Sequence, residues 1–254
     1  MILRRIGNKS KIASKIISYF PQHTIYFEPF FGAGGMFFNK PLAKYNYLND
    51  IDGDVYNLFQ VLINEPEKLY NLIELLPLHY DFMQYFKKVE QTDPIKKAAS
   101  FLFRSNYSYM GKGDMLKFSC NNSKTLLFSN FKNAIDRLKN CQFHNTDFRV
   151  FLRSFSFRRE LDKTNTFIYC DPPYVGTADN YSHSFTSKDT DDLILALIET
   201  DCKFAISEFE NDVVLELAKK HGLNVIQVIE RRTLNNRNVE ILLTNYKINN
   251  TLFS

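Results

Sequence analysis

Several features that mark other classes of protein are missing from this sequence. The four cysteines are widely spaced and include no Cys-x-x-Cys pair, so neither a disulfide framework nor a zinc site is expected. No apolar run approaches the roughly 20 residues of a membrane-spanning helix. The first residues turn polar too early for a secretory signal peptide. We therefore expect a protein of the reducing cytoplasm.

The composition is that of a folded protein, with 44% hydrophobic and 24% charged residues. The net charge is only +4, but it is distributed unevenly. Residues 87–163 hold 16 Lys and Arg against 7 Asp and Glu, whereas the rest of the chain is net acidic. A basic middle segment is typical of a surface that binds a polyanion. A solvated basic face would give the same count.

Strands and helices alternate at both ends of the chain, as judged from short apolar runs and helical periodicity. The expected strands are residues 24–27, 45–48, 166–170 and 203–207, and the expected helices are 9–20, 54–62, 190–200 and 212–221. A final antiparallel strand pair is expected at 225–230 and 239–246. This alternation predicts an α/β fold, with a parallel sheet and helices on both of its faces.

The middle of the chain predicts helices only. They are expected at residues 66–76, 81–90, 94–103 and 130–139. Because this stretch interrupts the alternation, we expect a core built from residues 1–62 and 141–254, with residues 63–140 as an inserted domain.

A glycine-rich turn, Gly32-Ala-Gly34-Gly35, follows the first expected strand. Such a turn lets the backbone approach a ligand at the carboxyl edge of a sheet. Asp50 ends the next strand, where an acid can bind the hydroxyls of a ribose. The Gly-Lys-Ser/Thr of a phosphate-binding loop is absent. The pattern indicates a nucleotide-type ligand, although a tight turn without a ligand remains an alternative.

The tetrapeptide Asp171-Pro172-Pro173-Tyr174 directly follows the apolar run 166–170. Two prolines lock its backbone and prevent the strand from continuing. A rigid loop at the carboxyl end of a strand is a good platform for a functional site. The structural alternative is a turn that carries a stacking tyrosine.

Taken in this order, the motifs resemble the Dam-type adenine-specific (N6) DNA methyltransferases. In that family the cofactor motif precedes the target-recognition segment and Asp-Pro-Pro-Tyr comes last, the alpha order. The similarity runs across nearly the whole chain, at residues 6–9, 27–34, 48–51, 147–148 and 169–174. It implies a Rossmann-like S-adenosylmethionine-dependent methyltransferase sheet, with residues 63–140 as a mainly helical DNA target-recognition domain.

The resemblance implies methyl transfer from S-adenosyl-L-methionine to the exocyclic N6 amine of an adenine flipped out of duplex DNA. Asp171 and the carbonyl of Pro172 would each accept one N–H of that amine, which returns its lone pair to nitrogen. Pro173 would help to lock the direction of that carbonyl, and Tyr174 would stack on the base. No metal is required.

The resemblance also implies which residues bind the cofactor. Lys9 corresponds to the family's N-terminal cofactor-contacting lysine, Asp50 would take the ribose, and Asp171 would face both cofactor and base. The loop around the methionine moiety would be formed by Glu28, Phe30, Gly32 and Gly34. The adenine ring would be bound by Asp147 and Phe148.

The segment expected to read DNA departs from the family. Members that read GATC carry a Gly-x-Phe-Asn-x-Pro-type hairpin, and residues 104–118 lack its Phe-Asn-x-Pro part, so GATC is not predicted. The segment still offers groups that suit DNA, and Tyr181 in the loop after the catalytic motif could fill the gap left by the flipped base. Arg104 suits guanine, Asn106 suits adenine, and Lys112 and Lys117 suit phosphates.

Other reactions on the same fold stay open. Cytosine N4 methyltransferases more often carry Ser in place of Asp171, and amide methylation usually goes with Asn there. RNA methylation and a non-catalytic DNA-binding relative are further alternatives. We expect a monomer that binds duplex DNA. The sequence does not say whether a cognate restriction endonuclease exists, or whether a bacterium or a phage encodes the chain.

Overall fold

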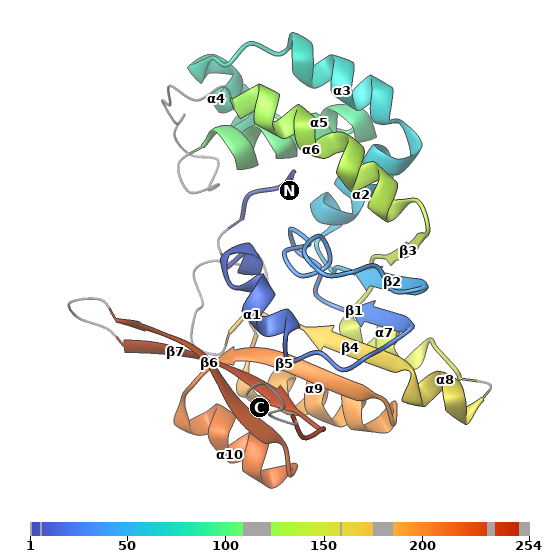
Figure 1. Ribbon diagram of the computed structural model, residues 1–254. Coiled ribbons are helices and arrows are strands. Elements are labelled where there is room, and N and C mark those ends of the chain that lie inside the picture. Colours follow the sequence, from blue (N-terminus) through green and yellow to red (C-terminus); the bar gives the residue numbers. More distant parts are fainter. Residues whose placement is uncertain are drawn as a thin grey trace, which may run out of the picture.

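The fold is built around one sheet of seven strands. The computed structural model describes residues 2–5, 7–108, 123–157, 159–174, 185–232 and 237–248. The strand order is β3-β2-β1-β4-β5-β7-β6 (Figure 1). The strands are β1 (Ile25–Glu28), β2 (Tyr45–Asn49), β3 (Cys141–His144), β4 (Thr166–Cys170), β5 (Lys203–Phe209), β6 (Asn224–Arg232) and β7 (Arg237–Thr244). Strands β1 to β5 pair in parallel, whereas β7 lies antiparallel between β5 and β6. The predicted α/β sheet and its final antiparallel pair are confirmed.

Neighbouring residues of the inner strands point to opposite faces, as the pleat requires. Tyr26 and Phe167 belong to one apolar cluster, while Phe27 and Ile168 belong to another. The first face is covered by α1 (Ala13–Ile17) and α2 (Gly53–Asn64). The second is covered by α7 (Phe148–Arg153), α9 (Ser187–Glu199) and α10 (Asp212–Lys220). Helices therefore lie on both faces of the sheet, as expected.

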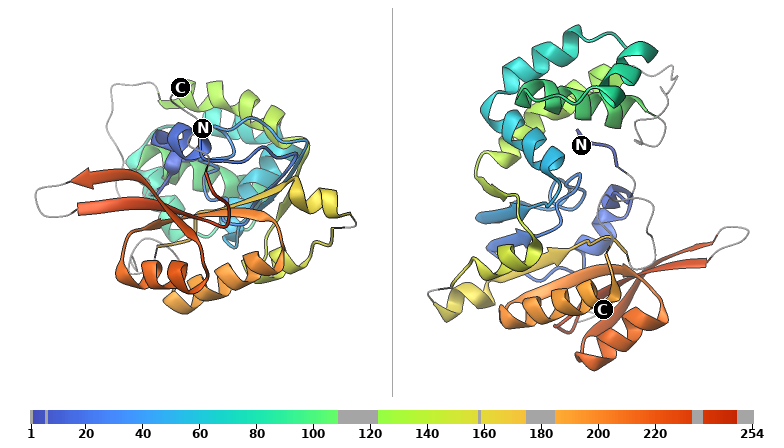
Figure 2. Two further views of the ribbon diagram at one scale, coloured as in Figure 1. Left: turned by 60° about the horizontal axis from the view of Figure 1, so that its bottom comes forward. Right: turned by 180° about the vertical axis from the view of Figure 1, so that it is seen from behind.

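The helical middle of the chain packs onto α2 at one end of the molecule (Figure 2). It consists of α3 (Pro66–Leu75), α4 (Tyr80–Lys88), α5 (Pro94–Tyr107) and α6 (Ser123–Leu138). Leu69, Ile73 and Leu102 share one apolar cluster with Tyr26 of the sheet. A separate small cluster holds Met83, Phe86, Phe103 and Tyr107. The helices expected to form an inserted domain thus share most of their core with the sheet.

The segment Ile2–Arg5 lies along the end of α5. Ser105 Oγ accepts the Arg4 N–H at 2.9 Å and donates to the Arg4 carbonyl at 2.5 Å. The amide of Asn106 donates to the Ile2 carbonyl at 2.8 Å. These bonds tie the start of the chain to the helix that leads toward the expected recognition segment.

Several elements differ from the sequence-based expectation. The helix expected at 9–20 is a 3-10 turn, Lys9–Lys11, followed by the short α1, because Ile12 between them has φ −118° and ψ 4°. Strand β3 and the short helices α7 and α8 (Glu160–Thr164) were not predicted. Within the described part of the chain, no helix is both long and apolar enough to cross a membrane.

Candidate active site

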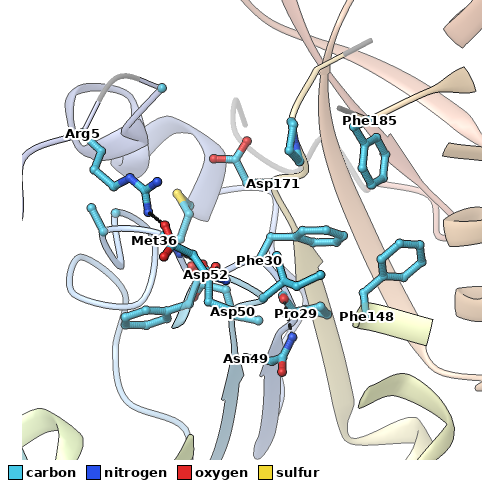
Figure 3. A pocket seen from close by; sticks show the side chains of 18 of the residues that line it. Arg5, Pro29, Phe30, Met36, Asn49, Asp50, Asp52, Phe148, Asp171 and Phe185 are labelled. Atoms are coloured by element: carbon cyan, nitrogen blue, oxygen red, sulfur yellow. Dashed lines mark hydrogen bonds and ion pairs between the residues drawn. The ribbon is translucent and has the colours of Figure 1, made fainter. Parts of the chain in front are cut away.

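A pocket opens at the carboxyl ends of β1, β2 and β4 (Figure 3). Parallel strands bring the segments that follow them to one edge of the sheet, which is where such folds bind ligands. Among the residues proposed from sequence for the cofactor, those that line the pocket are Lys9, Glu28, Phe30, Gly32, Asp50, Asp147, Phe148 and Asp171. The fold therefore brings together side chains that are far apart in the sequence.

The glycine turn after β1 needs its glycines for conformation and for space. Gly32 and Gly34 have φ of 53° and 70°, a region that L side chains rarely adopt. A Cβ on Gly34 would also meet the rings of Phe31 and Phe38 at 2.6–2.7 Å. A Cβ on Gly35 would meet Asn8 Oδ1 at 2.6 Å. Gly34 itself supports the wall of the pocket rather than lining it.

Two backbone amides hold Asp50 at the end of β2. The Gly32 N–H donates to Oδ2 at 2.5 Å and the Asp52 N–H donates to Oδ1 at 2.9 Å. Burial nevertheless raises the pKa of Asp50 to about 6, against the lowering effect of these amides. Each oxygen retains a further lone pair. The carboxylate is thus fixed in place and can still accept a hydrogen bond from a ligand in the pocket.

Three phenylalanine rings form one side of the pocket. Phe30 lies 5.3 Å from Phe148 and 5.9 Å from Phe185 between ring centroids, and Phe148 lies 6.0 Å from Phe185. Arg149 lies over the Phe148 ring and binds Asp189 at the start of α9 at 2.6 Å. Phe185 was not singled out from sequence, because a lone phenylalanine in a polar loop carries no signal. Together the three mutually inclined rings make an apolar wall suited to an aromatic ligand.

Glu28 is buried at the back of the pocket. Its Oε2 accepts the Tyr26 hydroxyl at 2.7 Å, which fixes the carboxyl group from the neighbouring position on the same face of β1. Burial raises the pKa of Glu28 to about 8. Lys40 lies over the Tyr26 ring at 4.1 Å, and burial lowers the pKa of this lysine to about 8. A cationic ligand group at Glu28 would favour its ionised form.

The Asp-Pro-Pro-Tyr loop meets Lys9 directly after β4. Lys9 Nζ lies 3.2 Å from Asp171 Oδ1 and donates a hydrogen bond to the Tyr174 hydroxyl. Burial raises the pKa of Asp171, and the Lys9 ammonium opposes that rise. Pro172 is buried, which holds the backbone between the two functional side chains. Lys9 therefore contacts the expected catalytic loop as well as the pocket.

A residue that the sequence reasoning missed completes this cluster. Glu240 of β7 has a side chain that is only 5% exposed, and its Oε1 lies 3.0 Å from Lys9 Nζ. The same oxygen accepts the Tyr174 hydroxyl at 3.2 Å. No local motif surrounds Glu240. Its place follows only from the pairing of β7 with β5, which sequence patterns do not specify.

The residues expected to contact DNA are placed less uniformly. Asn106 is a correction, because it is buried and its amide donates to the carbonyls of Ile2 and Leu102, so it faces no surface that DNA could reach. Arg104 lies in the last turns of α5, and its Nε is buried with no hydrogen-bond partner among the residues that the structure describes. Lys112, Lys117 and Tyr181 lie outside the described residues.

Comparison with known proteins shows the family of the chain. The family model described as D12 class N6 adenine-specific DNA methyltransferase matches residues 6–234, which include the glycine turn and the Asp-Pro-Pro-Tyr loop. The chain belongs to this family. The D12-class match thus confirms the resemblance inferred from the motifs, and it identifies the chain as an adenine-specific DNA methyltransferase.

Individual relatives of this D12-class methyltransferase are distant but cover nearly its whole length. DNA adenine methylase of Escherichia coli (strain K12) is 24% identical over 96% of this chain and 94% of its own. Type II methyltransferase M.MjaIII of Methanocaldococcus jannaschii is 26% identical over 96% of this chain and 98% of its own. Among solved structures, a magnesium protoporphyrin IX methyltransferase from Synechocystis PCC 6803 with bound SAM is 8% identical, with a TM-score of 0.41 over 94% of this chain and 80% of that one.

Proposed function

We propose that this enzyme transfers a methyl group from S-adenosylmethionine to the N6 amine of an adenine that has been flipped out of duplex DNA. The observation that carries the proposal is the position of Asp171. Its carboxylate lines the same pocket as the glycine turn and lies beside the locked Pro172-Pro173 backbone. The structure therefore has a hydrogen-bond acceptor for an amine directly beside a pocket suited to a nucleoside cofactor.

The lining residues fit the cofactor group by group. The rings of Phe30, Phe148 and Phe185 suit the adenine ring, and the fixed carboxylate of Asp50 suits the ribose hydroxyls. Glu28 would hold the ammonium of the methionine moiety, because its buried carboxyl group has only the Tyr26 hydroxyl as a hydrogen-bond donor among the described residues. When bound, the cofactor supplies an electrophilic methyl group on a sulfonium.

The protein's part in the chemistry is to make the amine nucleophilic. The lone pair of an adenine amine is delocalised into the ring. Asp171 Oδ and the Pro172 carbonyl would each accept an N–H, which favours a lone pair localised on nitrogen. Since burial raises the pKa of Asp171, this carboxylate is also a suitable acceptor for the proton that the amine loses.

Tyr174 would stack on the extruded base. Its ring centroid lies 4.4 Å from that of Phe209 with the two rings inclined at 74°, and Lys9 Nζ lies 4.3 Å from the Tyr174 centroid. Its hydroxyl is bound by Lys9 and Glu240. A ring held by these neighbours and by its hydroxyl can present one face in a fixed orientation. Such preorganisation reduces the entropy lost when the base enters.

The test is methylation of unmethylated plasmid DNA with labelled S-adenosylmethionine, followed by nucleoside analysis and single-molecule sequencing. We expect N6-methyladenine as the labelled nucleoside, at one recurring sequence. Label in N4-methylcytosine would show that the base assignment is wrong. No label in DNA, from protein whose folded state is verified by circular dichroism, would reject the proposed activity.

A further inference from the structure

Glu240 and Phe209 form a cross-strand pair beside the catalytic loop. They lie directly opposite each other in the antiparallel pairing of β5 with β7. Directly opposed residues of an antiparallel pair point to the same face of a sheet. Both contact Tyr174, since Phe209 packs on its ring and Glu240 accepts its hydroxyl. The pair therefore holds the stacking tyrosine at two points.

Glu240 also gives Lys9 a second carboxylate. The ammonium lies 3.0 Å from Glu240 Oε1 and 3.2 Å from Asp171 Oδ1. The Lys9 and Glu240 side chains are 7% and 5% exposed, so solvent screens this contact little. Burial alone would lower the pKa of Lys9, but the two carboxylates raise it above its usual value. The Lys9 ammonium is thus a cation shared by two carboxylates, and Asp171 is only one of them.

Sharing matters because Asp171 has to accept a hydrogen bond from the substrate amine. A lysine bound to Asp171 alone would occupy lone pairs that the amine needs, and it would reduce the negative charge that the amine meets. A lysine bound elsewhere would leave the negative charge of the buried Asp171 carboxylate without a neighbouring positive charge. Glu240 supplies the intermediate arrangement, in which Lys9 stabilises Asp171 without saturating it.

We propose that Glu240 is a positioning residue for methyl transfer: it divides the Lys9 ammonium between two carboxylates and holds the Tyr174 hydroxyl, so that Asp171 and the Tyr174 ring face the target base. This inference rests on the proposed function, because it assigns Glu240 a part in that same reaction. Glu240 would not touch the base itself.

The central experiment is Glu240→Gln, which keeps the size and shape of the side chain and removes its charge. Methyl transfer to plasmid DNA is measured across pH, together with the KM for cofactor, the Kd for DNA and the melting temperature. Glu199→Gln is the matched control, because it also removes one carboxylate of an ion pair, at 3.7 Å from Arg153 on the surface of α9. This control is expected to behave as wild type.

For Glu240→Gln we expect kcat to fall by up to about 100-fold, as for an ångström-scale misplacement of reacting groups, with unchanged Kd for DNA. The neighbouring carboxylate of Glu240 raises the pKa of Asp171. Its removal should therefore shift the acid limb of the kcat profile to lower pH, which loss of fold stability alone would not do.

Tyr174→Phe provides a second, milder variant that keeps every charge. We expect a smaller fall in kcat, and the double variant should lose less than the two single losses multiplied together, because both act through the same hydroxyl. Wild-type kcat in Tyr174→Phe would overturn the claim that the hydroxyl is held for catalysis, even if Glu240→Gln does not fold.

Wild-type kcat with an unmoved acid limb in Glu240→Gln would overturn the inference as a whole. Failure of the proposed function is distinguishable, because it would appear as absent methyl transfer by the wild-type enzyme before any variant is compared. A fall in kcat for Glu240→Gln without the shift of the acid limb would reject the shared-cation argument.

Discussion

The pocket edge of the sheet and the helical insertion are stabilised in different ways. Around the pocket, named polar contacts fix each group, such as the Gly32 amide on Asp50 and the Tyr26 hydroxyl on Glu28. The insertion is held mainly by apolar packing of α3, α5 and α6 against α2. Polar contacts depend on residue identity, whereas apolar packing tolerates substitutions that conserve volume. The proposed chemistry can therefore stay constant while the surface proposed to read DNA changes.

The strongest test of this separation is Asp171→Ala. Loss of a preorganised acceptor should reduce kcat by about 100- to 1,000-fold. The affinity for DNA should stay near that of wild type, because the basic segment is untouched. Single-turnover methylation and a filter-binding or polarisation assay measure the two quantities on one preparation. Undiminished turnover would refute the role of Asp171, and equal loss of DNA affinity would refute the separation.

A pair of core substitutions tests how far the insertion depends on the sheet. Phe59→Ala empties a fully buried site in the shared cluster and should cost about 3–5 kcal/mol in urea unfolding. Phe86→Ala should cost less, because Phe86 lies in the small cluster of α4 and α5 and has fewer buried neighbours there. A separate low-urea transition in Phe86→Ala would show that the insertion unfolds on its own.

Reversing the charge of Lys112 and Lys117 tests whether this segment of the insertion binds DNA. If each lysine neutralises one phosphate, the slope of log K against log salt should become shallower by about 1.8, or about 0.9 for each phosphate that is no longer neutralised. Turnover at saturating DNA should change little. Lys219→Glu, on the exposed side of α10, is the control for charge alone. An unchanged slope would remove this segment from the interface.

The stability of the pocket should also depend on pH. Burial raises the pKa of Glu28 to about 8, so the folded chain keeps a proton that the unfolded chain loses near its ordinary value. The folded state then binds more protons between about pH 5 and pH 8, and the free energy of unfolding should fall as pH rises through that window. Asp50, with a pKa raised to about 6, acts in the same direction over a narrower range.

Glu28→Gln removes this contribution and should flatten the decline, as measured by urea unfolding at several pH values without cofactor. The same decline in Glu28→Gln as in wild type would show that Glu28 is ionised in the folded protein across the range.

Much of the fold could be predicted because its strands are apolar and end in recognisable motifs. Strands β1, β2 and β4 each run directly into residues that line the pocket, so pattern and site reinforce each other. Strand β3 was missed because Cys141-Gln-Phe-His alternates over only four residues and contains no β-branched residue. It is a strand because the edge of β2 provides pairing for it, a tertiary effect that outweighs local preference.

The site shows the same limit. Lys9, Asp50 and Asp171 sit in or beside local motifs, and the structure gathers them around one pocket. Asn106 has the chemistry to read adenine, but its amide is already bound to backbone carbonyls inside the molecule. Glu240 has no motif, and its role depends on the register of β5 with β7. Identity of a side chain predicts what it can bind, whereas only the fold decides what it does bind.

The contact between Lys9 and Glu240 has a consequence for the order in which the enzyme becomes competent. It joins the first helical turn to the last strand of the sheet, and β4 with the catalytic loop is synthesised between them. During synthesis this contact cannot form until β7 has been made. On a ribosome, the Asp-Pro-Pro-Tyr loop would therefore be synthesised before Glu240 is available to bind Lys9. Methylation activity should therefore appear only after β7 has paired with β5.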